Sequence, residues 1–251
     1  MSNPEIGIIG GTGGIGKWFA DLFQKEGFNV HVSGRKTGMR VVEMAGRCAI
    51  VIVSVPISAT EAVIREVGPH LPPASLFMDL TSLKSTPVKA MLESSPCEVI
   101  GLHPLFGPDV ASLSDQNVVV CPARGRKWLP WLQDLLSACG ALLIETSPEK
   151  HDEIMAVVQG LTHLNTMTMG LVLRETGLSS DVLDSFSTPI FRAKLAFIEK
   201  VFQKNPRLYA EILTSNPHMS KILAYYERVL NRLREPVVKG DSEALEKLLK
   251  S

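Results

Sequence analysis

Hydrophobic and polar residues follow two different patterns along the chain, and the change comes near residue 147. Before it, short apolar runs rich in β-branched residues alternate with stretches of helical periodicity. Strands that alternate with helices in this way are typical of a mostly parallel, doubly wound sheet. We predict strands over residues 6–9, 30–33, 49–55, 76–80, 99–102, 118–120 and 142–145.

After Ser147 and Pro148 the strand pattern ends and long helical periodicities replace it. The predicted fold class is therefore α/β, with a Rossmann-like domain over residues 1–147 and an all-helical domain over residues 148–251. We expect the helical domain to supply the substrate cleft and the interface of a homodimer. The predicted helices cover residues 149–175, 180–203, 206–214 and 217–234, with a short last helix after Gly240.

A glycine-rich segment follows the first predicted strand and leads into a predicted helix. This order is the fingerprint of a dinucleotide-binding unit, in which the helix N-terminus presents N–H groups to the pyrophosphate. We expect Gly11 to allow the tight turn, Gly13 to let the backbone approach the pyrophosphate, and Gly16 to let helix and strand pack closely. The residues expected to contact the cofactor here are Gly11, Thr12, Gly13, Gly14, Ile15 and Gly16. The alternative is a structural turn.

The end of the second predicted strand indicates which cofactor binds. NAD-binding units place an acidic residue there to hold the ribose 2′-OH, whereas this chain has Ser33, Arg35 and Lys36. A hydroxyl and two cations suit a 2′-phosphate, so we predict NADP, with NAD as the alternative. Val55 and Pro56, at the end of the third strand, complete the expected cofactor contacts.

Composition excludes several other classes of protein. Lys plus Arg equals Asp plus Glu at 26 each, so no overall charge recruits nucleic acid or an anionic membrane surface. The longest apolar stretch, residues 48–57, is too short to span a bilayer, and no signal segment is evident, so we expect a cytosolic protein. The four cysteines are widely spaced, which predicts buried thiols and neither a metal site nor disulfides.

Polar residues that could handle protons follow the fourth and fifth predicted strands. Ser82 lies just beyond the fourth strand and His103 ends the fifth. Doubly wound sheets place their sites at such strand ends, and a histidine there can act as acid or base with an ionisation near neutrality. Each residue could also be structural, as a turn former or a strand cap, but together they are a candidate proton-handling pair.

Three groups of residues resemble the prephenate dehydrogenases, also called TyrA proteins, and most closely the bacterial type fused to chorismate mutase. The first group is Asp79-x-x-Ser82-x-Lys84 followed by His103-Pro104-x-Phe106-Gly107-Pro108. The second group is His151-Asp152 followed by Gln159 and His163, and the third is Thr188-Pro189-Ile190-Phe191-Arg192. The resemblance covers nearly the whole chain.

The resemblance implies an enzyme of tyrosine biosynthesis that oxidatively decarboxylates prephenate to 4-hydroxyphenylpyruvate, with hydride transfer to the nicotinamide. It implies that His103 accepts the proton of the C4 hydroxyl, that Ser82 hydrogen-bonds in the same cluster, and that Arg192 binds a substrate carboxylate. The residues implied to line the cleft are Lys84, His151, Gln159 and His163. The sequence begins at the first strand and ends at residue 251, so we expect neither a mutase domain nor a regulatory domain for tyrosine feedback.

Other functions remain open. Arogenate or 4-amino-4-deoxyprephenate could be the substrate, because both share the ring chemistry. A β-hydroxyacid dehydrogenase would share the two-domain layout but should have a lysine where the long helix carries Gln159 and His163. A non-enzymatic NADP sensor would bind the cofactor without needing His103, Ser82 or Arg192.

Overall fold

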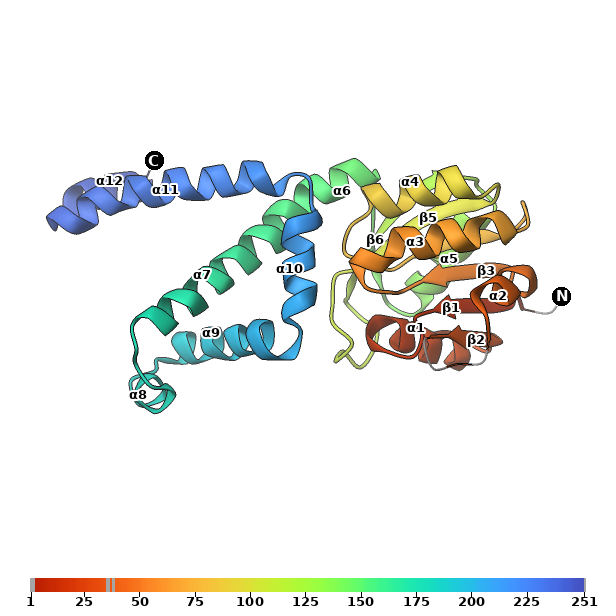
Figure 1. The fold of residues 1–251 in the computed structure, drawn as a ribbon, viewed down its shortest axis with the longest axis horizontal. Coiled ribbons are helices and arrows are strands. Elements are labelled where there is room, and N and C mark those ends of the chain that lie inside the picture. The colour runs from red at the N-terminus through yellow and green to blue at the C-terminus, as the bar shows by residue number, and fades with distance from the viewer. Residues whose placement is uncertain (1–2, 35–36, 38, 251) are drawn as a thin grey trace. The chain divides into compact units, whose positions relative to one another are not determined.

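The computed structural model describes residues 3–34, 37 and 39–250 (Figure 1). The chain divides into two compact units, one ending at Glu153 and the other beginning at Ile154. The boundary predicted after residue 147 lies slightly earlier in the chain. The first unit therefore includes most of helix α6 (Pro148–Met155).

The first unit is built on one seven-stranded sheet in the order β2-β1-β3-β4-β5-β6-β7. Neighbouring strands are parallel except β5 and β6, which pair antiparallel. This confirms the predicted mostly parallel sheet, although β5 and β6 extend further than the apolar runs that predicted them. The strands are β1 (Ile6–Ile9), β2 (Val30–Ser33), β3 (Ile50–Val53), β4 (Leu76–Asp79), β5 (Glu98–Pro104), β6 (Asn117–Arg124) and β7 (Leu142–Glu145).

Helices cover both faces of this sheet (Figure 1). Ile50 and Ile52 of β3 point to the face that packs on α1 (Gly14–Lys25) and α5 (Trp128–Ala138). Val51 and Val53 point to the opposite face, because successive side chains of a strand alternate. Three helices cover that opposite face: α2 (Val41–Arg47), α3 (Ile57–Val67), which runs into a 3-10 turn (Gly68–His70), and α4 (Ser85–Ser94).

The described residues of the second unit form helices joined by short turns, with no strand among them, as predicted. The long helix expected from residue 149 runs without interruption from α6 through the π-helical η2 (Ala156–Leu161) into α7 (Thr162–Glu175). The elements that follow are α8 (Ser180–Ser185), α9 (Pro189–Glu199), the π-helical η3 (Lys200–Lys204), α10 (Pro206–Ser215), α11 (Met219–Lys239) and α12 (Ser242–Lys250).

The prediction of a single helix over residues 180–203 is wrong, because the helix is interrupted between α8 and α9. Thr188 has extended backbone angles, and its hydroxyl accepts a hydrogen bond from the Phe191 N–H at 3.2 Å. Pro189 follows at the first helical position, where its missing N–H costs nothing. Thr188 and Pro189 therefore start a new helix with Arg192 in its first turn.

No helix in the described part of the chain is long and apolar enough to cross a membrane.

Candidate functional site

The glycine-rich turn connects β1 to α1. The tight turn was expected at Gly11, but the left-handed conformation falls on Gly10, at φ +86°. A Cβ on Gly10 would lie 2.1 Å from the carbonyl oxygen of Ser54, so only glycine fits there. Gly16 packs as predicted, because a Cβ on it would lie 2.6 Å from the Gly10 carbonyl oxygen.

Gly13 is a glycine that neither packing nor backbone conformation explains, whereas Gly14 has a left-handed φ of +49° that favours glycine. A Cβ built on either would meet no described atom within 4 Å, and both residues are exposed with Thr12. Helix α1 begins directly after Gly13 without a side-chain cap. Open space beside uncapped N–H groups at a helix N-terminus fits a bound anion. The turn thus fits the pyrophosphate of a dinucleotide. Ile15 is half-buried and lies in the first turn of the helix.

The other predicted cofactor contacts lie at the ends of β2 and β3. Ser33 is buried, and its hydroxyl donates to the Met39 carbonyl at 2.9 Å, which favours a role in shaping the loop over a contact with a 2′-phosphate. Arg35 and Lys36 lie outside the described residues. Val55 is half-buried and Pro56 is exposed just before α3, at the same sheet edge as the glycine turn.

The loop from β4 to α4 is held by a buried ion pair. Lys84 and Asp79 are both fully buried, and the Lys84 ammonium donates to the Asp79 carboxylate and, at 2.9 Å, to the Leu102 carbonyl. The Thr81 N–H and hydroxyl also donate to Asp79. This environment favours a supporting role for Lys84, beneath the site, over the direct substrate contact that the resemblance implies. Ser82 lies half-buried in the same loop.

His103 on β5 and His151 on α6 form a buried pair. His103 Nδ1 lies 2.8 Å from His151 Nε2, and the ring centroids are 5.0 Å apart at 69°. His151 Nδ1 in turn donates to a carboxylate oxygen of Asp152 at 2.8 Å. The Asp152 carboxylate also accepts from the backbone N–H groups of Lys84, at 2.8 Å, and Ser85, at 2.9 Å, which begin α4.

The environment of His103 keeps it uncharged. Burial, followed by the neighbouring His151 and Lys84, lowers the pKa of His103 well below its ordinary value of 6.5, against an opposing effect of Asp152. The sequence predicts that His103 ionises near neutrality, and this prediction is wrong because its pKa in the structure lies well below 6.5. A neutral imidazole at pH 7 can accept a proton, which is the form a general base requires.

The second unit holds the remaining predicted residues. Gln159 lies in η2, one turn before His163 in α7. His163 is buried against the rings of Tyr209 and Phe197, at centroid distances of 4.8 Å and 6.2 Å. Its Nδ1 atom has no hydrogen-bond partner among the described residues, and burial lowers its pKa.

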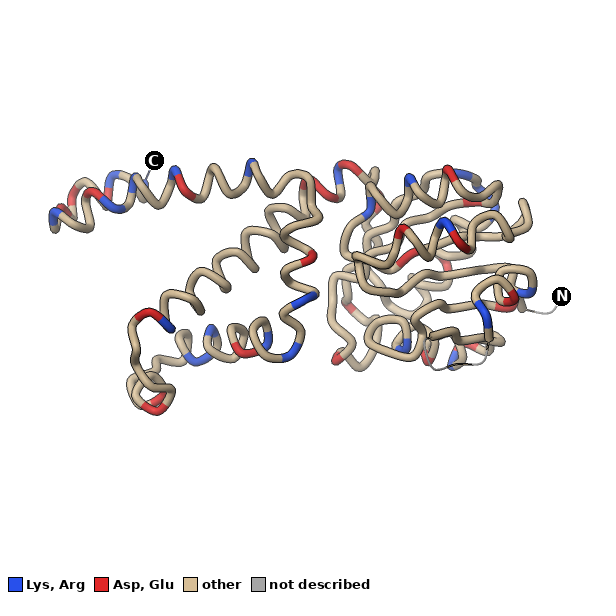
Figure 2. Tube along the Cα trace, viewed as in Figure 1, with Lys and Arg blue, Asp and Glu red and all other residues tan. Residues whose placement is uncertain are grey.

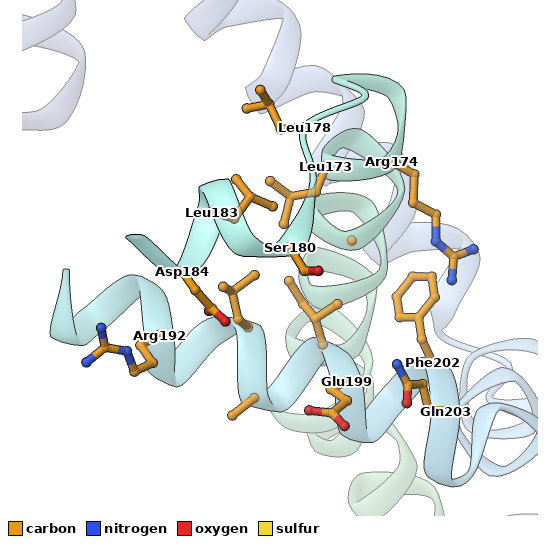
Figure 3. A pocket seen from close by; sticks show the side chains of 14 residues that line it. Leu173, Arg174, Leu178, Ser180, Leu183, Asp184, Arg192, Glu199, Phe202 and Gln203 are labelled. Atoms are coloured by element: carbon orange, nitrogen blue, oxygen red, sulfur yellow. The ribbon is translucent and has the colours of Figure 1, made fainter. Parts of the chain in front are cut away.

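Arg192 lies on a groove of about 760 Å³ within the second unit, between α7, α8, α9 and η3 (Figure 3). Its exposed side chain points away from Phe202 and Gln203, which lie further along the groove. Arg192 and Phe197 are five residues apart on α9, so the helical repeat turns them roughly 140° away from each other. The structure therefore does not bring Arg192 onto the helix face that contacts His163.

Glu5, His31 and Cys48 are a group that could hold a metal, with ligand atoms within 4.8 Å of one another. The Glu5 carboxylate already accepts hydrogen bonds from His31 at 2.9 Å and from Arg47 at 3.0 Å. Burial raises the pKa of Cys48 to about 11, so this thiol stays protonated. We interpret the group as an ion-pair cluster. Cys97 and Cys121 are buried as predicted, and Cys139 is half-buried.

Comparison with known proteins identifies the family. The nucleotide-binding domain of prephenate dehydrogenases matches residues 19–145, and their dimerization domain matches residues 147–251. The chain belongs to the prephenate dehydrogenase family. This confirms the resemblance that the strand-end and helix motifs indicated.

Individual relatives of the prephenate dehydrogenase family show how far the similarity extends. The chain is 38% identical over 268 residues to a probable arogenate/prephenate dehydrogenase of Methanocaldococcus jannaschii, covering 99% of this chain and 60% of that protein. It is 36% identical over 222 residues to the T-protein of Enterobacter agglomerans, covering 88% and 59%. The chain thus spans about three fifths of the length of these relatives.

A solved structure of the family shares the fold. The prephenate dehydrogenase from A. aeolicus, crystallised with hydroxyphenyl propionate and NAD+, superposes with a TM-score of 0.74 at 20% identity. The similarity covers 100% of this chain and 96% of that one.

Sequence reasoning missed two carboxylates of the candidate prephenate dehydrogenase site. Asp79 and Asp152 belong to the motifs that carry the resemblance, but the sequence alone predicts for neither a contact with a functional side chain. The signal for Asp152 was its position directly after His151, and the signal for Asp79 was its place at a buried strand end, where a lone carboxylate needs a cation.

Proposed function

We propose that this protein is a prephenate dehydrogenase that uses NADP to convert prephenate oxidatively to 4-hydroxyphenylpyruvate and CO₂. Arogenate or 4-amino-4-deoxyprephenate is the alternative substrate. The M. jannaschii relative is named for both arogenate and prephenate, so it does not separate the two substrates.

Neutral, buried His103 at the carboxyl edge of the sheet is the observation that carries the proposal. Strands β1, β3, β4 and β5 are parallel neighbours, so the glycine turn after β1 and His103 at the end of β5 lie at one edge. Three strand spacings separate β1 from β5, or about 14 Å. This separation suits an extended dinucleotide with its pyrophosphate at the turn and its nicotinamide toward β5.

The chemistry assigned to His103 is proton removal. The bound nicotinamide supplies an acceptor for the hydride that leaves C4 of the ring. As the C4 carbonyl forms, His103 takes the proton of the C4 hydroxyl. Cleavage of the bond to the ring carboxylate releases CO₂, its electron pair makes the ring aromatic, and the proton on His103 returns to the phenolate oxygen. Ser82, in the β4–α4 loop, is proposed to hydrogen-bond in the same cluster.

Substrate binding is the role proposed for the remaining predicted residues. Arg192 carries a planar guanidinium suited to a carboxylate. A buried polar atom without a hydrogen bond costs about 1–3 kcal/mol, so the Nδ1 atom of His163 is suited to a polar group of the substrate. His151 and Gln159 are each proposed to contact the substrate, and Lys84 is proposed to support the loop that carries Ser82.

A homodimer completes the proposal, because the matched second domain is named for dimerization. Figure 2 shows that η2 and most of α7 carry no Lys, Arg, Asp or Glu, whereas α11 and α12 carry many. Val157 and Val158 of η2 and Leu171 and Val172 of α7 are nonetheless at least half exposed. Such an uncharged, apolar surface is typical of a subunit interface.

The test is a turnover assay with prephenate, arogenate and 4-amino-4-deoxyprephenate, each with NAD and NADP, following the absorbance of the reduced nicotinamide. We expect turnover of prephenate with NADP. Turnover of arogenate or 4-amino-4-deoxyprephenate in place of prephenate would change the substrate assignment and leave the rest of the proposal in place. Cofactor binding without turnover of any of them would favour a sensor or a β-hydroxyacid dehydrogenase. A further assay with a 3-hydroxy acid separates these two.

A further inference from the structure

We propose that Asp152 is a positioning residue that fixes, through His151, which nitrogen of His103 is free of hydrogen and acts as the base. The proposal rests on the proposed function for its catalytic consequence. The hydrogen-bond pattern itself can be tested without any substrate.

The pattern starts from Asp152, which is an acceptor only. Burial raises its pKa, but hydrogen bonds from His151, Ser85 and Lys84 outweigh that effect and hold the pKa below its ordinary value of 3.8. The carboxylate is therefore ionised at pH 7 and has no hydrogen to donate. His151 Nδ1, at 2.8 Å from Asp152, must carry the hydrogen of that bond.

The hydrogen on His151 Nδ1 fixes the state of the next ring. In the proposed arrangement His151 carries this one hydrogen, so its Nε2 is an acceptor. His103 Nδ1 lies 2.8 Å from this acceptor and must therefore carry a hydrogen. The single hydrogen of neutral His103 is then on Nδ1, and its Nε2 holds the lone pair that can take a proton.

The same chain of bonds stabilises the protonated product of that step. When His103 Nε2 takes the proton, the ring becomes an imidazolium whose Nδ1–H donates to His151, and His151 donates to the Asp152 carboxylate. The positive charge that forms on His103 is therefore linked through two hydrogen bonds to the negative carboxylate of Asp152. The charged or titratable groups facing His103 from neighbouring elements are His151 and Asp152 of α6 and Lys84 beside α4.

A purely structural role for Asp152 is the competing explanation, because its carboxylate also accepts from the first N–H groups of α4. Asp152→Asn separates the two roles. An amide can turn its NH₂ group toward His151 Nδ1, which would place the His151 hydrogen on Nε2 and force His103 to carry its own on Nε2. The base would then be blocked even though the ring remained in place.

The experiment combines a spectroscopic and a kinetic readout on the full chain. Long-range ¹H–¹⁵N spectra of histidine-labelled protein at pH 7 report which ring nitrogen of His103 is protonated, with His103→Asn used for assignment. Glu153→Gln is the matched control, because it replaces a carboxylate by an amide at the next, exposed position. Wild type and control should show His103 with hydrogen on Nδ1, and Asp152→Asn should show it on Nε2 or on both.

With the substrate identified by the turnover assay, kcat of Asp152→Asn should fall by about a hundredfold to ten-thousandfold, with the Kd for NADP within about threefold of wild type. An unchanged His103 spectrum in folded Asp152→Asn would overturn the proposal, even if stability fell. If Asp152→Asn does not fold, His151→Phe replaces it, because this variant leaves the bonds from Asp152 to α4 in place. His103 should then lose its single protonation pattern, and retention of hydrogen on Nδ1 alone would overturn the proposal. If the protein turns over none of the substrates but the spectra are as expected, the proposed function is refuted and the proposed hydrogen-bond pattern stands.

Discussion

His103 Nδ1 and His151 Nε2 lie 2.8 Å apart, so two buried imidazoles share a single hydrogen between these atoms. A second hydrogen between these nitrogens would set two N–H donors against each other and add a positive charge near the buried ammonium of Lys84. The pair therefore favours the neutral state that a proton acceptor needs.

Replacing His103 by Asn should remove the base while preserving the cofactor site. We expect kcat to fall by about a hundredfold to ten-thousandfold, the usual contribution of a positioned base. Isothermal titration should give an NADP affinity close to that of wild type. Undiminished turnover in this variant would show that the proton goes elsewhere.

Acid should destabilise the first unit, with an onset near the ordinary histidine pKa of 6.5. Folded His103 has a pKa well below that value, so the unfolded state binds more protons as the pH falls. The contribution of neutral His103 to the free energy of unfolding is therefore fully present above pH 6.5. It is lost as the pH falls from 6.5 toward the pKa of His103 in the folded state. Urea unfolding at about pH 7.5 and about pH 5.5 measures this loss, because the two pH values lie on either side of the ordinary histidine pKa.

Tryptophan fluorescence is a suitable probe for that experiment, because Trp18, Trp128 and Trp131 all lie in the first unit. His103→Asn should lose less stability between the two pH values than wild type. The exposed His70→Asn serves as the control and should behave as wild type. Equal acid sensitivity in all three proteins would refute the prediction.

Arg192→Lys should weaken substrate binding more than it slows the chemistry. Lysine keeps the charge but loses the two parallel N–H donors that bind a carboxylate, so KM should rise roughly tenfold or more with a smaller fall in kcat. Arg232→Lys, the same change at an exposed position of α11, is the control. Wild-type values of both constants in Arg192→Lys would leave Arg192 without a role in binding.

Arg35→Ala should discriminate between the two nicotinamide cofactors. Only NADP carries the 2′-phosphate that a guanidinium would pair with, so KM for NADP should rise about tenfold or more while KM for NAD changes little. Arg40→Ala, at an exposed position just before α2, is the matched control. Equal losses for both cofactors would contradict the predicted NADP preference.

A charge placed on the exposed apolar face of α7 should disrupt the homodimer. Val172 is 55% exposed in the isolated chain, and Val172→Glu would bury a carboxylate in the proposed interface. Light scattering at micromolar concentration should give a dimer for wild type and a monomer for Val172→Glu. Lys89→Glu on α4 should remain dimeric. A wild-type mass equal to one chain would refute the dimer itself.

The sheet could be predicted from the sequence because strands buried on both faces are continuous apolar runs. Ile50 to Val53 is such a run, and its neighbours follow the same rule. The extension of β5 and β6 could not be predicted, because polar and proline positions such as Asn117 and Pro122 join the strand only through pairing with the neighbouring strand. The break before α9 was visible as Thr188 followed by Pro189, but the apolar periodicity around it outweighed this signal.

The candidate site was predictable where chemistry follows strand ends and not where it depends on long-range contacts. His103 could be found because it ends a strand. Its bond to His151 joins residues 48 positions apart, and Asp152 reaches Lys84 across 68 positions. No local periodicity encodes such pairings. Arg35 and Lys36 lie outside the described residues, so the NADP prediction still rests on the sequence.

The cap that Asp152 supplies to α4 has a consequence for exchanging parts between related enzymes. A hybrid joined at Ser147, where the sequence pattern changes, would take α6 from the other parent. The first N–H groups of α4 would then depend on a foreign residue to accept their hydrogen bonds, and His103 would depend on a foreign ring. Functional hybrids should therefore tolerate a junction after Glu153, where the compact units divide, better than one at Ser147. His103 and its supporting carboxylate are inherited together only when the crossover lies beyond Asp152.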